Sequence, residues 1–292
     1  MQDLQFLIDH RDSYIKGKTW DGAYEFATLA SVLRREVGAI EFSKRVVGLD
    51  RLGTLMEFEE SLKLFERGGV SPASPFTDYE KLWGEPLNHT RKLFEFYAAS
   101  GINLNGKNAV EIAKESDHSQ HNPDILIGDG YSIMGIACKV VSGLNIQTVI
   151  ENIEKASLQV KVSKASKGVA LLDVRNRIDN ELLITKTGVD SYRTFKCTRH
   201  AEEVIQGELA TLADQVLDAT SPQWRQDRYE ETSCKAFILH AHSCAILETG
   251  HGPVPTCVGK ARIVPIIDGQ DPELDDALEL GGWIGNGIQI SV

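Results

Sequence analysis

The sequence contains no long apolar segment. Its longest apolar runs, such as residues 236–239 and 263–267, fall far short of the roughly 20 residues that a membrane-spanning helix needs. Residues 1–4 do not begin the basic and then apolar pattern of a secretion signal. The five cysteines stand at irregular spacings without a CxxC pair, which is more typical of reduced thiols than of a disulfide framework. These absences predict a cytoplasmic protein without a membrane segment.

The sequence also lacks an excess of positive charge. Its formal net charge of −11 at pH 7 argues against a protein that coats nucleic acid, because such binding depends on Lys and Arg side chains that neutralise phosphates. A local basic cleft in an otherwise acidic protein is still compatible with this composition. The P-loop, GxGxxG and HExxH motifs are absent from the sequence, so these signatures of nucleotide binding and of metalloproteases are missing.

The apolar content is sufficient for a folded core. Hydrophobic residues make up 42% of the 292 residues, enough for one large domain or two ordinary ones. Residues 1–66 carry apolar side chains at helical spacing. Glycines and prolines in residues 68–75 then interrupt any helix. We therefore expect a helical N-terminal region over residues 1–75 and an α/β domain over residues 76–292.

The second region alternates between short β patterns and longer helical patterns. A helix is expected at residues 90–100, with Gly101 as a favoured C-terminal stop. Residues 249–253 are typical of a hairpin turn. The expected strands are residues 109–113, 124–127, 132–141, 168–174, 235–247 and 260–267, and the further expected helices are residues 145–164, 201–217 and 273–280.

Two neighbouring expected strands carry an acid and a lysine. Pro123 and Asp124 open the first strand, where a proline is tolerated because no ladder donor is needed. Lys139 ends the apolar run of the next strand, and a lysine in a central strand needs an acidic partner or a function. A carboxylate can hold Mg²⁺, and an ammonium group can orient water or stabilise a developing phosphate charge. Asp124 and Lys139 would face each other across a hairpin, and this arrangement predicts phosphodiester chemistry.

This motif and the order of the elements around it resemble the PD-(D/E)xK nuclease superfamily, which has the restriction-endonuclease-like fold. The resemblance covers about residues 88–176. It implies an α/β core of helix, three-stranded meander, helix and strand, with the helical N-terminal region as an extension. It also implies a nuclease that uses Mg²⁺ or Mn²⁺ to hydrolyse phosphodiester bonds of DNA in a defence, restriction or mobile-element setting. A homodimer is left open.

The resemblance also assigns roles to individual residues. Asp124 and Glu95, the latter on the preceding helix, would bind the metal ion. Lys139 would orient the attacking water or stabilise the charge on the phosphate. Lys155 and Gln159 lie one helical turn apart on the following helix, so both can reach across the site and assist at the phosphate or the water.

The chain departs from the family pattern at Ala137, two residues before Lys139, where the superfamily has Asp or Glu. A methyl group cannot bind Mg²⁺. Three explanations stay open. The metal ligand has moved to the following helix, at Glu151 or Glu154, or the natural acid was replaced by engineering. Alternatively, the chain has lost the chemistry and is an inactive nuclease-like module that binds nucleic acid or a partner protein.

Another expected strand carries alternating potential metal ligands. His240, His242 and Cys244 would project to one face of this strand, and His251 and Cys257 follow. Imidazole and thiolate groups are ligands that Zn²⁺ prefers. Structural zinc sites more often contain a tight CxxC or HxxxH pair, and the sequence has neither around these residues. We therefore favour a half-buried strand with polar partners over a zinc-stabilised interaction protein.

Overall fold

The computed structural model describes residues 94, 95, 98, 99, 101, 102, 110–112, 123–128, 133–162, 165–183, 185, 187, 188, 193–250, 252–266, 281 and 282. These residues form an α/β fold with a mixed sheet, the fold class that the sequence predicts. The expected helical region over residues 1–75 and the expected helix over residues 273–280 lie outside the described residues.

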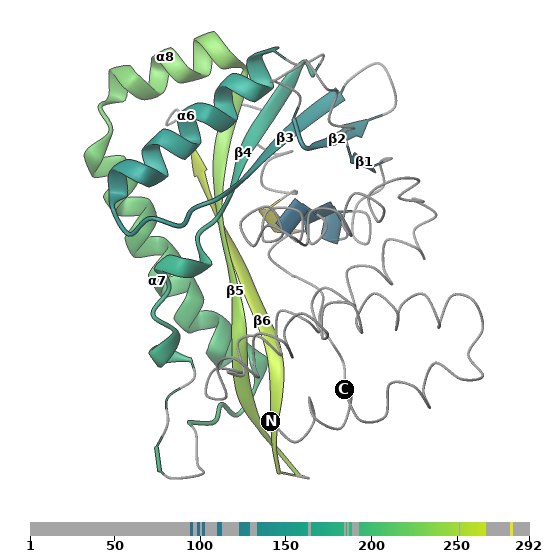
Figure 1. Cartoon of the computed structure of the whole chain (residues 1–292), viewed down its shortest axis with the longest axis vertical. Coiled ribbons are helices and arrows are strands. Elements are labelled where there is room, and N and C mark those ends of the chain that lie inside the picture. Colours follow the sequence, from purple (N-terminus) through teal and green to yellow (C-terminus); the bar gives the residue numbers. More distant parts are fainter. Residues whose placement is uncertain are drawn as a thin grey trace, which may run out of the picture.

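The described strands form one sheet of six strands that follow one another in chain order (Figure 1). The strands are β1 (Val110–Ile112), β2 (Ile125–Gly128), β3 (Ile133–Val140), β4 (Lys167–Asp173), β5 (Cys234–Thr249) and β6 (Gly252–Pro265). β1, β2 and β3 are antiparallel neighbours, and β5 and β6 form an antiparallel pair. β3, β4 and β5 run parallel, so crossover connections must join them.

Helices supply these crossovers. α6 (Ile146–Val162) joins β3 to β4, and α7 (Thr198–Ala219) and α8 (Pro222–Thr232) join β4 to β5. Figure 1 shows all three helices on the same face of the sheet. Two short 3-10 helices, η1 (Arg175–Arg177) and η2 (Asn180–Leu182), follow the end of β4. Apart from η1, η2 and α8, the order of the elements from β1 to β6 agrees with the sequence prediction.

The sequence patterns do not predict α8. Most of its side chains are polar, so it lacks a regular apolar stripe. Its start carries a local signal instead. Ser221 caps the helix by accepting a hydrogen bond from the Trp224 backbone N–H, and Pro222 occupies the first turn. The Trp224 indole Nε1 then donates a hydrogen bond of 3.0 Å to Glu154 of α6, which fixes α8 against α6.

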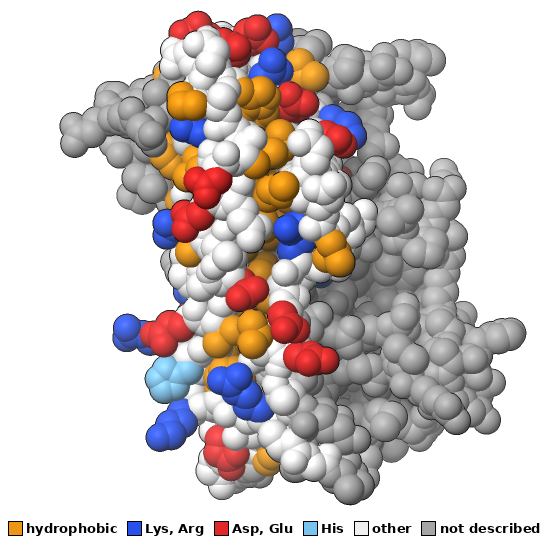
Figure 2. Space-filling view, turned by 90° about the vertical axis from the view of Figure 1, so that its left-hand side faces the viewer, with side chains coloured by type: hydrophobic (Ala, Val, Ile, Leu, Met, Phe, Trp, Pro, Cys, Tyr) orange, Lys and Arg blue, Asp and Glu red, His pale blue; other side chains and the backbone are white. Residues whose placement is uncertain are grey.

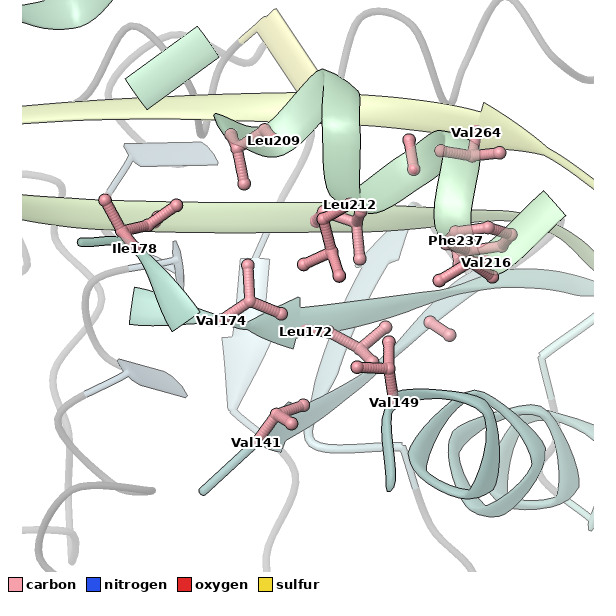
Figure 3. Packing of buried hydrophobic residues seen from close by; sticks show 14 of the residues in the cluster. Val141, Val149, Leu172, Val174, Ile178, Leu209, Leu212, Val216, Phe237 and Val264 are labelled. Carbon is pink, nitrogen blue, oxygen red and sulfur yellow. The ribbon is translucent and has the colours of Figure 1, made fainter. Parts of the chain in front are cut away.

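An apolar core fills the space between the sheet and its helical layer (Figure 3). On α6, the buried residues Val149, Ile153 and Val160 recur at helical spacing and form one stripe. Ala170 and Leu172 of β4 alternate toward the same layer. Figure 2 shows apolar side chains gathered between the helices on this side of the molecule. The apolar stripe that predicts α6 from the sequence is also the face through which α6 packs on the sheet.

Helical residues that precede β1 cover the other face of the sheet. The ring of Phe94 stacks on His240 of β5, with 5.6 Å between the ring centroids. Gly101 and Ile102 are also helical, so Gly101 is not the C-terminal stop that the sequence predicts. The side chain of Ile102 is fully buried, and its packing offsets the cost of about 1 kcal/mol for a helical glycine. We call the helical residues 94, 95, 98, 99, 101 and 102 the Phe94 helix.

β5 and β6 form a long hairpin. Their register runs from Ala236 opposite Pro265 to Thr249 opposite Gly252, which confirms the expected turn. β6 begins well before residue 260, its expected start. Pro253 is one of the prolines that argue against a strand there, but β6 is the last strand in the described sheet order, and prolines are tolerated on edge strands.

The start of β4 leaves no room for a side chain at Gly168. A methyl group there would overlap the backbone oxygen of Gly135 and the side chain of Val160. We expect Gly168→Ala to lower the free energy of unfolding by about 1–3 kcal/mol, the usual cost of overpacking. Urea denaturation measures this change.

Gly207→Ala is the matched control for Gly168→Ala. Gly207 is an exposed residue in α7, and a methyl group there would meet no atom within 4 Å. Because alanine is the better helix former, this substitution should raise the free energy of unfolding by about 0.5–1 kcal/mol. Equal effects of the two substitutions on stability would contradict the close packing at Gly168.

Candidate functional site

Asp124 lies at the entry to β2 and is fixed to the neighbouring strand. Its backbone N–H donates a hydrogen bond of 2.9 Å to the carbonyl of Ile136. Its carboxylate oxygen Oδ2 accepts a hydrogen bond of 2.6 Å from the backbone N–H of Cys138. The Asp124 carboxylate is therefore held beside β3, at the residue between Ala137 and Lys139.

Lys139 is a half-buried residue near the carboxyl end of β3, in register with Leu172 of β4. Alternation along the strand places its side chain on the same face as that of Ala137. Ala137 is fully buried in the apolar core between the sheet and the helices. The position that carries an acid in the family pattern is thus buried among apolar side chains in this chain.

The candidate residues on α6 have different surroundings. Glu154 accepts the Trp224 hydrogen bond and so holds α8 in place. Glu151 and Lys155 are exposed, whereas Gln159 is half-buried. The exposure of Glu151 keeps its carboxylate in water, and the hydrogen bond of Glu154 gives that side chain a structural role.

Gln159 lies on the flank of α6 that is turned away from α8. The spacing of Glu154 and Gln159 separates them by about 140° around the helix axis, and Glu154 faces α8. α8 contacts β5, whereas β2 lies next to β3, toward the opposite edge of the sheet. Of the candidate α6 residues, Gln159 therefore combines partial burial with a position on the side nearest β2 and Asp124.

Glu95 belongs to the Phe94 helix and is buried. The stacking of Phe94 on His240 places this helix over β5. His240 pairs in register with Asp173, whereas Lys139 pairs with Leu172, the next residue along β4. Because neighbouring residues of a strand face opposite sides, Lys139 and the Phe94 helix lie on opposite faces of the sheet. The structure brings Asp124 to the strand of Lys139 and places Glu95 on the other face.

Comparisons of the chain with protein-family models, curated proteins and solved structures found no match. The site must therefore be interpreted from its own residues. Across the described residues, no group of three or more His, Cys, Asp or Glu side chains is arranged to hold a metal ion. Within the same part of the chain, no helix has the length and apolar character to cross a membrane.

A buried polar cluster surrounds His240, on which Phe94 stacks, and the sequence patterns singled out its two histidines but not its acid and its arginine. The carboxylate of Asp173, at the end of β4, is fully buried and binds the Arg175 Nε at 2.6 Å. His240 and His242 are buried on the adjacent strand, with 5.4 Å between their ring centroids. We call these four residues the β4–β5 polar cluster.

The cluster revises the interpretation of the histidine strand. The strand was expected to be half-buried with polar partners. Both histidines are buried, and the charged groups that act on the pKa of His242 are Arg175 and Asp173. The side chain of Cys244 and residue His251 lie outside what the structure describes. A sequence signal for the cluster does exist. Asp173 ends an otherwise apolar strand and is followed two residues later by an arginine, which is the pattern of an acid that needs a partner.

Burial keeps the two imidazoles neutral. Burial lowers the pKa of His240 well below its ordinary value, and His242 and Arg175 lower it further. Burial is also the main cause of the lowered pKa of His242, where Arg175 acts in the same direction and Asp173 in the opposite one. Neutral imidazoles beside the Asp173–Arg175 ion pair avoid a further buried charge.

These shifts predict that acid weakens the fold. Unfolding exposes both imidazoles, which then bind protons below their ordinary pKa of about 6.5, whereas the folded protein keeps them neutral. The unfolded state binds more protons as the pH falls, so the free energy of unfolding decreases below about pH 6.5 and does not change from this cause at higher pH. We expect a loss of up to about 1.4 kcal/mol per pH unit for each imidazole, measured by urea denaturation.

Two variants separate these histidines from the other titrating groups. His240→Gln should reduce the slope of stability against pH by about the share of one imidazole. His200→Gln, at an exposed histidine of α7, is the matched control for the substitution itself. A slope that is the same in the wild type and in His240→Gln would remove the buried histidines as its cause.

Proposed function

We propose that the protein is a metal-dependent nuclease of the PD-(D/E)xK type that hydrolyses phosphodiester bonds of DNA. The observation that carries this proposal is the hydrogen bond of 2.6 Å between the Asp124 carboxylate and the Cys138 backbone N–H. It puts the acid of one strand beside the residue that directly precedes Lys139 in the next. An acid and a lysine on adjacent strands are the pair on which the resemblance rests.

The order and directions of the elements support the proposal. Helical residues precede an antiparallel meander of β1, β2 and β3, and α6 then leads to β4, which is parallel to β3. This is the sequence of elements that the resemblance implies for a restriction-endonuclease-like core. Asp124 lies at the entry to β2, and Lys139 lies near the end of β3.

Among the residues described around β2 and β3, Asp124 is the carboxylate that fits a metal ion. One of its oxygens already accepts the Cys138 N–H bond, and Ala137 offers no ligand. A Mg²⁺ ion that is held by one protein carboxylate relies on water and on substrate phosphate oxygens for its other ligands. When bound, such an ion polarises the phosphate and lowers the pKa of a bound water.

The part of Lys139 in the proposed reaction follows from its charge and position. It is half-buried at the end of β3, where its ammonium group can donate to a phosphate oxygen or to the attacking water. Partial burial lowers the local dielectric constant and strengthens the attraction to a developing negative charge. Gln159, with its amide group on the near flank of α6, can orient the water.

Ala137 favours a second candidate function, a nuclease-like module that binds nucleic acid without cutting it. The side chain of Ala137 is fully buried among core residues. A carboxylate there would have to be desolvated in an apolar environment, which is costly without partners. The packing around Ala137 thus suits the alanine, as expected if the chain has given up the second acid.

Substitutions of the two central residues test the proposed roles. Asp124→Asn should weaken Mg²⁺ binding, because the amide lacks the negative charge of the carboxylate. Lys139→Ala should leave Mg²⁺ binding largely intact and slow cleavage on the order of 10²-fold or more, the scale of losing one positioned electrostatic group. Calorimetric Mg²⁺ titration and a plasmid-cleavage assay measure the two effects.

Lys161→Ala, which removes an exposed lysine at the end of α6, is the control for the change in net charge. It should cleave like the wild type. Equal Mg²⁺ affinity of the wild type and Asp124→Asn, or full cleavage by Lys139→Ala, would overturn the role assignment. DNA binding by a wild-type protein that does not cleave would favour the second candidate function.

Ala137→Glu distinguishes the two candidate functions further. We expect this variant to lose about 2 kcal/mol or more of unfolding free energy, because the core must accept a larger and charged side chain. Ala137→Gln, of the same size but without charge, is its matched control. A gain of Mg²⁺-dependent cleavage in Ala137→Glu alone would show that the position still serves as a ligand site.

A further inference from the structure

The loop that leaves β3 is held down by the chain that leaves β4. Residues 141–145 join β3 to α6 and begin with Val141, whose backbone N–H donates to the Asp173 carbonyl at 2.9 Å. From η1, the Asn176 side chain donates to the Val141 carbonyl at 3.4 Å. The Arg177 Nη1 donates to the carbonyls of Leu144, at 2.5 Å, and of Gly143, at 3.5 Å. We call residues 141–145 the β3–α6 loop.

Positive groups flank this loop. Lys139 precedes it on β3, and the guanidinium of Arg177 lies over its second half. The amino end of α6 closes it, where the Asn145 side chain accepts a hydrogen bond from the Gln147 backbone N–H and the first helical turn has no acidic residue, so no negative charge offsets the positive end of the helix dipole. The acid next to η1, Asp173, is already paired with Arg175. Asp179, beyond η1, is exposed and accepts the backbone N–H of Glu181.

An apolar side chain projects from the same loop. Leu144 is 75% exposed, and it is one of two exposed large hydrophobic residues in the described part of the chain. The hydrogen bond from Arg177 to its carbonyl fixes the Leu144 backbone, so the side chain projects from a fixed point of the loop. Cations beside a fixed apolar group suit a ligand that is anionic along one edge and apolar along the other, as nucleic acid is.

We propose that the β3–α6 loop is a DNA-binding element in which Arg177 binds a backbone phosphate and Leu144 packs against an adjacent sugar or base. The inference rests on the proposed function, because the loop starts only two residues after Lys139, which belongs to the proposed cutting site. Arg177 keeps its charge at neutral pH although partial burial lowers its pKa. In a chain with a net charge of −11, such a local basic site is where phosphate attraction would concentrate.

The salt dependence of DNA binding tests this proposal. The full chain is titrated with a short fluorescent DNA duplex in EDTA, which prevents metal-dependent cleavage, over a series of NaCl concentrations. Arg177→Ala should reduce the slope of log affinity against log salt by about 0.9, the share of one phosphate contact. Its affinity should fall roughly tenfold or more, the scale of one hydrogen bond to a charged group.

Three further variants make the result specific. Arg199→Ala removes an arginine of α7 whose side chain is 83% exposed, and it should keep the wild-type slope and affinity. Arg177→Lys keeps the charge and should keep the slope. Leu144→Asp adds a negative charge at an exposed position without removing the loop contacts, so it should weaken binding even if Arg177→Ala does not fold. Thermal unfolding of each variant checks folding.

The outcomes separate this inference from the proposed function. A wild type that binds the duplex through Arg177 and Leu144 but does not cleave DNA in Mg²⁺ would retain the inference and overturn the nuclease proposal. Cleavage by the wild type with unchanged binding in Arg177→Ala and Leu144→Asp would retain the nuclease and overturn the inference. Binding to phosphatidylserine vesicles but not to DNA, weakened by the same variants, would identify the loop as a membrane contact and also overturn it.

Discussion

The burial of β4 on both faces is the constraint on which the rest of the described structure depends. All its residues after Lys167 are buried, and it lies between β3 and β5 with parallel neighbours on each side. A strand in this position needs apolar cover above and below. α6 covers β4 on one face, next to α7 over β5 and β6, and the Phe94 helix lies on the other face, where Phe94 stacks on His240 of β5. The close approach at Gly168 then fixes how deeply α6 sits on the sheet.

The end of β4 is where this apolar strand becomes polar, and several features meet there. Asp173 receives the Arg175 side chain on one face and, through its backbone carbonyl, the start of the β3–α6 loop. The next residue, Val174, donates its backbone N–H to the carbonyl of His240. The backbone of Asp173 and Val174 therefore connects the β4–β5 polar cluster to the loop that follows Lys139. A disturbance of the ion pair would reach the proposed DNA-binding loop through the hydrogen bond between the Asp173 carbonyl and the Val141 backbone N–H.

The sequence predicted the order of the elements well because the apolar period changes from helix to strand at each junction, as in α6 and β4. It also predicted that Asp124 and Lys139 lie on adjacent strands. It could not predict the burial of Ala137, because alternation tells which residues share a face but not which helix covers it. α8 escaped prediction since a polar helix is identified by its Ser221 cap and its contact with Glu154 rather than by periodicity. The Asp173–Arg175 pair depends on burial that only the assembled sheet creates.

The long β5–β6 hairpin has a consequence for the order in which the chain folds. Its strands are joined by a tight turn, so its contacts are local and such hairpins form within microseconds. The parallel pairs β3–β4 and β4–β5 instead require the α6 and the α7–α8 crossovers to close first, which carries a larger loss of chain entropy. We therefore expect the hairpin to form early and the closing of the two crossovers to limit the folding rate.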